Sequence, residues 1–272
     1  MASNNSVLPA DFLSGPGPRI EVNRIDFTKT DLPEYKDNWA VVLDNVLSKE
    51  ECDLLVSAAE AHSGGEWERA MVNVGGGMQR MITDTRNCGR IIWDDGEVAQ
   101  KIWARCEEHV PEIQKLDAWP KVTGNGPMMR KEIWEMTRLN ERLRFLKYTS
   151  GEYFKPHCDG MYETPDHKER SYFTLHLYLN DITSDPSAPL KGGATTFHSM
   201  DMDRRFDVEP KIGRVLLFQH AYLVHSGDDV LGGVKLTLRT DIMYQKSKET
   251  STKEPPPKEE KKKSFWGSKQ RT

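Results

Sequence analysis

The sequence has few cysteines and no long apolar run. Its four cysteines, in a chain of 272 residues, form no CxxC pair. They give neither zinc-finger spacing nor the disulfide framework of a small secreted domain. No stretch of about 18 apolar residues occurs, and the first 18 residues lack the apolar centre of a signal peptide. We therefore expect free thiols, no membrane partner, and a cytoplasmic or nuclear location.

The chain also lacks a basic excess. Its net charge is −4, with 37% hydrophobic and 29% charged residues, which is ordinary for a globular protein. In the C-terminal stretch 246–272, eight lysines and one arginine face four glutamates, a charge of +5, so the remainder carries −9. Because nucleic acid binding requires a basic surface, we expect no nucleic acid partner.

The pattern along the chain predicts one folded domain between two loose ends. Residues 1–30 are expected to form a flexible arm and residues 246–272 a disordered charged tail. Within 31–245, helical patterns dominate up to about residue 140; one helix should begin at Ser48, where Glu51 completes a capping box. From 141 to 245, short period-two apolar segments alternate with turns, which favours a barrel or jelly roll. The predicted class is α+β, with helices supporting a β core.

The most informative motif is His157-Cys158-Asp159, which follows a strand-like segment. On a strand, residues two apart point to the same face, so the imidazole and the carboxylate can face inward together. These are two of the three ligands of the facial triad that holds non-haem Fe(II) and leaves positions open on the metal. A His-x-Asp triplet alone is common, so this assignment requires a third ligand from elsewhere in the chain.

A later histidine and a basic strand supply the remaining parts. His225 follows the apolar segment 215–218. The next strand then places Lys235, Thr237 and Arg239 on one face and leucines on the other. Buried cations require partners, and an anionic co-substrate would provide one.

Taken together, these segments resemble the 2-oxoglutarate/Fe(II) dioxygenase superfamily, in its prolyl 4-hydroxylase-like branch. That branch carries His-x-Asp, a distal histidine, and a basic residue ten positions after it; here these are His157, Asp159, His225 and Lys235. Segment 140–148 resembles the strand with the branch's co-substrate tyrosine, and 192–197 its glycine turn. Gly213 and Phe218 fit the strand ahead of the distal histidine. Weaker likeness extends N-terminally through residues 42–47 and Arg86-Asn87-Cys88, so that the resemblance covers about residues 38–245.

The resemblance implies a double-stranded β-helix, which is a jelly-roll core. It implies Fe(II) as cofactor and 2-oxoglutarate and O2 as co-substrates, and includes ascorbate among the expected cofactors. The metal ligands would be His157, Asp159 and His225. Tyr148 and Lys235 would bind the far carboxylate of 2-oxoglutarate, with Thr237 adding a hydrogen bond. The expected reaction is hydroxylation coupled to decarboxylation of 2-oxoglutarate to succinate and CO2.

Several alternatives stay open from sequence alone. His220 and His198 compete with His225 as third ligand, and Arg239 competes with Lys235 for the carboxylate. His176 is expected to be structural. The loop 160–170 should be mobile, with Tyr162 as a candidate substrate contact. The substrate could be a small molecule or a peptide, including a prolyl side chain, and a metal-free jelly-roll binding module is the alternative to an enzyme.

Overall fold

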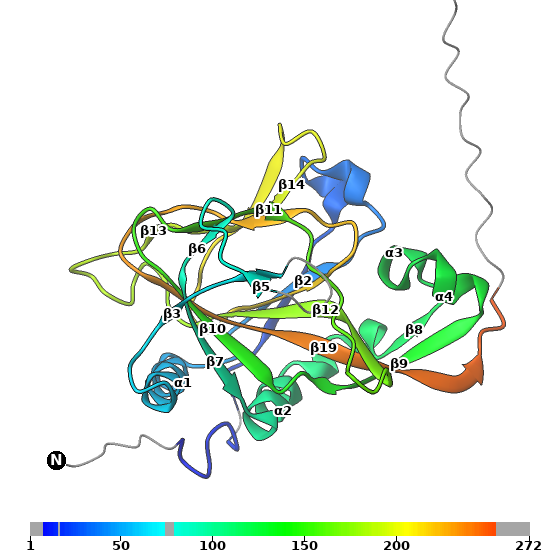
Figure 1. Cartoon of the computed structure of the whole chain (residues 1–272), viewed down its shortest axis with the longest axis horizontal. Helices are drawn as coiled ribbons and strands as arrows, with labels where there is room; N and C mark the ends of the chain where they lie inside the picture. The colour runs from blue at the N-terminus through cyan, green and yellow to red at the C-terminus, as the bar shows by residue number, and fades with distance from the viewer. Residues whose placement is uncertain (1–7, 16, 74–78, 254–272) are drawn as a thin grey trace, which may run out of the picture.

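Two antiparallel sheets form the body of the protein in the computed structural model, which describes residues 8–15, 17–73 and 79–253 (Figure 1). The larger sheet has ten strands in the order β1-β2-β16-β12-β19-β10-β7-β3, with β9 pairing β19 and β8 pairing β9. Their bounds are β1 Glu21–Arg24, β2 Ala40–Asp44, β3 Glu68–Arg69, β7 Gly89–Asp94, β8 Lys115–Asp117, β9 Glu132–Leu139, β10 Arg142–Tyr148, β12 Glu169–Tyr178, β16 Val215–Gln219 and β19 Lys235–Thr250.

The smaller sheet faces the larger one and has five strands in the order β15-β14-β17-β11-β6. Its strands are β6 Arg86–Asn87, β11 Tyr153–His157, β14 Thr195–His198, β15 Arg205–Val208 and β17 His225–Gly227. Two short hairpin-like pairs complete the described strands: β4 Val72–Asn73 with β5 Gln79–Arg80, and β13 Lys191–Gly192 with β18 Val230–Gly232.

The chain alternates between the two sheets. After β10 in the larger sheet it enters β11 in the smaller one, returns for β12, crosses to β14 and β15, returns for β16, and repeats this through β17 and β19. This alternation is the connectivity of a double-stranded β-helix, so the predicted jelly-roll core is confirmed. Alternate residues of each strand therefore face the space between the sheets.

Two helices, α1 Lys49–His62 and α2 Gly96–Ala104, support the outer side of the larger sheet, whereas Tyr35 of a short 3-10 turn contacts His198 of β14 in the smaller sheet (Figure 1). The other described helices are α3 Pro120–Thr123 and α4 Asn125–Met129, with short 3-10 turns at Phe27–Lys29, Pro33–Tyr35, Glu107–His109 and Pro111–Ile113. Figure 1 shows α1 and α2 on the side of β7 and β10 away from β11 and β14. The predicted capping box is present, since Ser48 accepts from the Glu51 N–H and Glu51 accepts from the Ser48 N–H. None of these described helices has the length and apolar character needed to cross a membrane.

The N-terminal half contributes more than helices. Strands β2, β3, β7 and β9 all belong to the larger sheet, so the supporting segment completes the sheet as well as covering it. The amphipathic pattern of residues 97–110 predicts one helix, but α2 ends at Ala104 and a separate short turn follows. The glycines at 75–77 predict a hairpin loop, and they lie outside the described residues.

Both end segments that were predicted to be flexible contain residues that belong to the folded domain. Within the predicted arm, β1 pairs with β2 and Phe12 is buried, because its apolar residues pack on the core beside α2. At the other end β19 continues to Thr250 instead of stopping at 245. It pairs there with β9, and the Lys246 ammonium lies 2.9 Å from the Glu132 carboxylate.

Candidate active site

Two histidines meet across a strand pair of the smaller sheet. His157 ends β11 and His225 begins β17, and the two are direct partners in the register. Their ring centroids lie 4.4 Å apart. Residues 68 positions apart in the sequence thus become neighbours because β11 and β17 are hydrogen-bonded.

Asp159 completes a cluster of three ligand atoms. It lies two residues beyond the end of β11, and its carboxylate oxygens are 3.7 Å from Nε2 of His157 and 3.7 Å from Nε2 of His225. One atom from each of the three residues lies within 4.8 Å of the others. Two imidazoles and a carboxylate at this spacing are the donor set of a facial triad.

Both histidines are held with one nitrogen free for a metal. Nδ1 of His157 is 2.8 Å from the Lys155 carbonyl, and Nδ1 of His225 is 3.2 Å from the Leu223 carbonyl. A carbonyl accepts, so Nδ1 carries the proton and Nε2 keeps its lone pair. Burial lowers the pKa of His225 to about 3, and Asp159 offsets this only in part. The ring is therefore neutral at neutral pH, which is the form that coordinates metals.

Asp159 is ionised and fixed from the facing sheet. Burial raises its pKa, but Arg239 and the two histidines outweigh burial and hold the pKa of Asp159 well below its ordinary value. Arg239 Nη2 is 3.0 Å from Oδ1, and the Thr174 hydroxyl donates to Oδ2 at 2.5 Å. The carboxylate is thus available as an anionic ligand and is oriented by β12 and β19.

The rival histidines lie outside this cluster. His198 Nε2 contacts the Ser226 hydroxyl at 2.7 Å, and its position on β14 gives no contact to Asp159 among the described residues. His220 is buried with Nε2 3.6 Å from Asp241. The only group of this kind within the described ranges contains His225 and neither rival.

The larger sheet faces the triad with a buried lysine. Tyr148 and Lys235 are partners between β10 and β19, and the ammonium of Lys235 lies 5.3 Å from the Tyr148 ring centroid and 5.7 Å from that of Tyr178. Lys235 is 2% exposed and has no carboxylate within 4.0 Å in the described part of the chain. Burial lowers its pKa to about 8. A buried ammonium without an anion is costly, which indicates that an anionic ligand belongs here.

Further polar atoms near Lys235 lack partners. The Thr237 hydroxyl and Nε2 of His176 are buried, and neither forms a hydrogen bond within the described residues. Such a buried orphan group costs about 1–3 kcal/mol. His176 was expected to be structural; it is a strand residue as predicted, but it lines the cavity between Lys235 and the triad.

One cavity joins the two halves of the site. Its lining residues come from both sheets. The lining comprises Arg86, Leu146, Tyr148, Phe154, His157, Asp159, His176, Thr195, Phe218, His225, Ser226, Gly227, Lys235 and Arg239. It has the donors for a dianion at one end and for a divalent metal at the other.

Glycine leaves room for the lysine side chain. Gly193 has a φ of +75°, and a Cβ there would lie 3.1 Å from Cδ of Lys235. Only glycine adopts this conformation without strain and allows the lysine side chain to pass.

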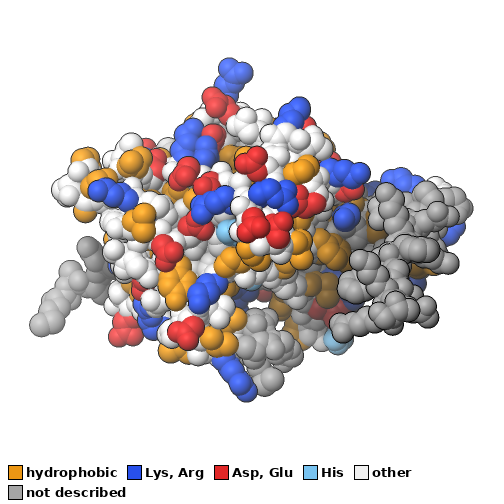
Figure 2. Space-filling view, turned by 90° about the horizontal axis from the view of Figure 1, so that it is seen from above, with side chains coloured by type: hydrophobic (Ala, Val, Ile, Leu, Met, Phe, Trp, Pro, Cys, Tyr) orange, Lys and Arg blue, Asp and Glu red, His pale blue; other side chains and the backbone are white. Residues whose placement is uncertain are grey.

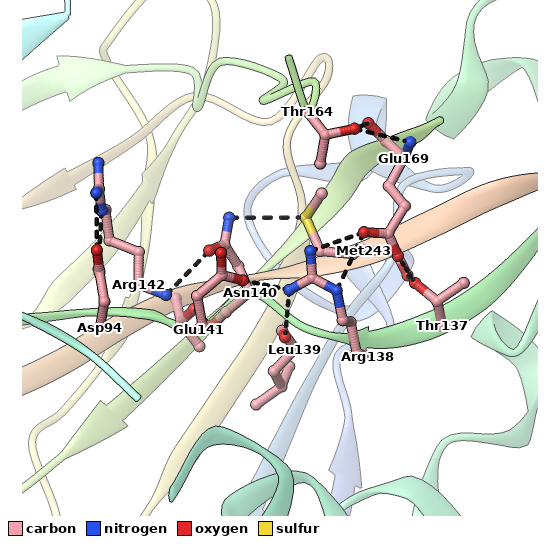
Figure 3. A network of polar contacts seen from close by, with 11 residues as sticks. Asp94, Thr137, Arg138, Leu139, Asn140, Glu141, Arg142, Thr164, Glu169 and Met243 are labelled. Atoms are coloured by element: carbon pink, nitrogen blue, oxygen red, sulfur yellow. Dashed lines mark hydrogen bonds and ion pairs between the residues drawn. The ribbon is translucent and has the colours of Figure 1, made fainter. Parts of the chain in front are cut away.

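Tyr162, the candidate substrate contact, is 39% exposed and lies outside the cavity lining. Its loop is closed by its own hydrogen bonds, including the exchange between Tyr162 and Ser171. At the base of the loop, Glu169 binds Arg138 and Thr137 of β9 (Figure 3). Whether the loop is mobile stays a prediction.

Some site residues were not predicted from the sequence. Arg86 stacks over Phe154 at 4.6 Å, and Phe154 stacks on His157 at 3.7 Å between centroids. Thr174, whose hydroxyl donates to Asp159, was likewise not assigned to the site from the sequence. The alternation Thr174, His176, Tyr178 was visible and could have placed all three inside, since residues two apart share a face.

Residues 143–240 match the family described as the 2OG-Fe(II) oxygenase superfamily. No curated protein matches the chain in sequence. The chain is similar in structure to the viral collagen prolyl hydroxylase of Paramecium bursaria Chlorella virus-1, in complex with 2OG (19% identity, 76% of this chain and 96% of that one, TM-score 0.45). It is also similar to a Pseudomonas putida prolyl-4-hydroxylase (17% identity, 77% of this chain and 95% of that one, TM-score 0.47). A third similar structure is a Trichoplax adhaerens prolyl hydroxylase solved with a hypoxia inducible factor peptide fragment (13% identity, 80% of this chain and 95% of that one, TM-score 0.48).

The family match spans the strands from β10 to β19, which together carry the three clustered ligands and Lys235. Residues 143–240 of this chain thus match the 2OG-Fe(II) oxygenase superfamily, and the match supports a 2-oxoglutarate-dependent oxygenase.

Proposed function

We propose that His157, Asp159 and His225 hold Fe(II), and that Lys235, Tyr148 and Thr237 bind the far carboxylate of 2-oxoglutarate. The assignment rests on one cavity that holds a set of metal-ligand atoms at one end and a lysine in need of an anion at the other. Two histidines, of which His225 is neutral, lie with an ionised carboxylate at one end, and a buried lysine without an anion within 4.0 Å lies at the other. A dicarboxylate that chelates the metal and reaches the lysine satisfies both.

Lys235 is favoured over Arg239 as the carboxylate partner. Arg239 already pairs with Asp159 at 3.0 Å and with Asp241 at 3.2 Å, whereas Lys235 has no such anion among the described residues. We assign Arg239 to holding Asp159 in place. His176 lies beside the path of the co-substrate and adds a neutral ring, because burial and the nearby Lys235 keep its pKa well below the ordinary value.

When bound, the metal supplies oxygen activation, and the outcome is hydroxylation of a substrate C–H bond with conversion of 2-oxoglutarate to succinate and CO2. The chain's own contribution is orientation and exclusion of water from the cavity. The substrate is a small molecule or a peptide side chain, proline included, and ascorbate belongs in the assay as an accessory reductant. A cytoplasmic or nuclear location is part of the same proposal.

Anaerobic addition of Fe(II) and 2-oxoglutarate tests this assignment. We expect the weak visible absorption band of the chelate in the unmutated protein and none in His157→Ala or Lys235→Met. Lys147→Met is the matched control, because Lys147 lies on β10 next to Tyr148 but on the outer face, over the Trp67 ring. A folded protein that gives no band would instead support a metal-free jelly-roll binding module.

A further inference from the structure

Two arginines lie directly opposite each other beside the triad. Arg144 of β10 and Arg239 of β19 are partners in the strand register, and their side chains are only 19% and 21% exposed. Like charges placed opposite each other on neighbouring strands destabilise a sheet. Burial removes hydration from both, so the pair requires nearby anions.

One carboxylate, Asp241, bridges the pair. It is 3.2 Å from Nη1 of Arg144 through Oδ2 and 3.2 Å from Nη2 of Arg239 through Oδ1. The second acid at Arg239 is Asp159, at 3.0 Å. His220 adds no charge, because burial lowers its pKa, and both of its ring nitrogens lack hydrogen bonds within the described residues.

The charges of the side chains around Arg144 and Arg239 no longer cancel when Asp159 binds the metal. Asp159 and the near carboxylate of 2-oxoglutarate then neutralise the divalent ion, and Lys235 neutralises the far carboxylate. Arg144 and Arg239 are left with Asp241 alone, an excess of one positive charge. This excess stands out in a chain whose net charge is −4.

The arginine pair also has hydrogen-bond donors that no described residue uses. Nε of Arg239 has no partner, and Arg144 makes one hydrogen bond, to Asp241, in the part of the chain that the structure describes. Along the interior face of β10, Arg144 lies between Leu146 in the cavity lining and Arg142, which is half exposed and pairs with Asp94 (Figure 3). The pair therefore lies between the metal site and solvent.

We propose that Arg144 and Arg239 form a substrate subsite for a single carboxylate, so that the enzyme acts on a carboxylate-bearing compound. Guanidinium groups bind carboxylates through two parallel hydrogen bonds, which fixes the position of the substrate as well as its affinity. A group held there places the adjoining carbon chain next to Asp159 and the metal. The inference rests on the proposed function, because the charge excess exists only when Asp159 is a ligand.

Proton NMR of small probes tests the subsite without turnover. The protein is loaded with Mn(II) and 2-oxoglutarate, and the paramagnetic ion broadens signals of molecules bound nearby. The probes are matched acid and amide pairs: propionate with propionamide, and a capped Gly-Glu-Gly peptide with its Gln counterpart. We expect selective broadening of the acids, reduced tenfold or more in Arg144→Gln and only partly restored in Arg144→Lys, which keeps the charge but not the two parallel hydrogen bonds. Lys147→Gln, which removes a positive charge from the outer face of the same strand, should behave as the unmutated protein.

The other possible results distinguish two kinds of substrate from failure of the proposal. Broadening of propionate alone identifies a free acid as the substrate type, and broadening of the glutamyl peptide identifies an acidic side chain; both support the subsite. Equal broadening of acids and amides, or acid broadening unchanged in Arg144→Gln, overturns it. So does a loss of 2-oxoglutarate affinity in Arg144→Gln as large as the loss of probe binding. Calorimetry of Mn(II) and 2-oxoglutarate on the same samples isolates failure of the proposed function, which would appear as no binding of either.

Discussion

The ammonium of Lys235 lies over the ring of Tyr148, 5.3 Å from its centroid, with no carboxylate near it among the described residues. An aromatic face attracts a cation but replaces only part of its lost hydration. The lysine is thus maintained at a cost to the stability of the ligand-free protein.

Replacing Lys235 should raise the stability of the ligand-free protein while removing its affinity for 2-oxoglutarate. Lys235→Met removes a buried charge and keeps the side-chain volume, so we expect the metal-free protein to gain about 1–3 kcal/mol in free energy of unfolding. The same variant should lose 2-oxoglutarate binding. Denaturant unfolding and calorimetry measure the two effects. A destabilised Lys235→Met protein would contradict the view that the ammonium is unsatisfied without ligand.

The affinity for 2-oxoglutarate should depend on pH through Lys235. Burial lowers the pKa of Lys235 to about 8, and only the protonated form pairs with a carboxylate. The dissociation constant should stay level below pH 8 and rise about tenfold per pH unit above it. Lys235→Arg keeps its charge throughout this range, since arginine does not deprotonate in proteins. A titration by calorimetry that shows the same slope in both proteins would assign the titration to another group.

Metal affinity should depend on His225, which lies in the ligand cluster, and not on His198 or His220, which do not. We expect His225→Ala to weaken Mn(II) affinity by at least about a hundredfold, because the site keeps only two ligands. His220→Ala and His198→Ala serve as controls, since neither ring lies in the ligand cluster. Electron paramagnetic resonance of free Mn(II) gives the affinities. Strong loss in His220→Ala with retention in His225→Ala would reverse the assignment.

Gly193→Ala should weaken co-substrate binding through crowding of Lys235. The new Cβ would lie 3.1 Å from Cδ of the lysine, and alanine at a φ of +75° adds about 1–2 kcal/mol of strain. Gly151→Ala separates the two effects, because Gly151 has a φ of +81° with no atom within 4 Å of its Cβ position. Both variants should lose stability, and only Gly193→Ala should lose 2-oxoglutarate affinity. Equal affinities would show that the lysine side chain moves aside.

Local patterns predicted the parts of the site that come from single segments. The alternation of Lys235, Thr237 and Arg239 depends on residues two apart on a strand sharing a face. Asp159 joins His157 in the ligand cluster although β11 already ends at His157. The helix beginning at Ser48 was equally readable, because its capping box is a contact within four residues.

Features that depend on pairing between distant strands could not be predicted. Arg144 becomes a site residue only because β10 and β19 pair in one register, which places it opposite Arg239. The ends of the domain were misjudged for a related reason. Polar segments such as 246–250 look disordered alone and become a strand only because β9 offers its edge.

Charge on the outer surface gives little guidance to the substrate. Figure 2 shows Lys and Arg side chains interspersed with Asp and Glu over the face seen from above, without a field of one sign. Long-range attraction toward this face is therefore weak, and selection at it depends on contacts within the site.

His157 and His225 belong to the smaller sheet, whereas Tyr148 and Lys235 belong to the larger one. Under the proposed assignment, a metal with its co-substrate would therefore link the two sheets more extensively than the metal alone. Adding the metal and 2-oxoglutarate together should raise resistance to proteolysis and heat by more than the sum of their separate effects, because each ligand orders residues near the other. Such a protein would persist in a cell according to its supply of 2-oxoglutarate, and its abundance would report on metabolism before any product formed.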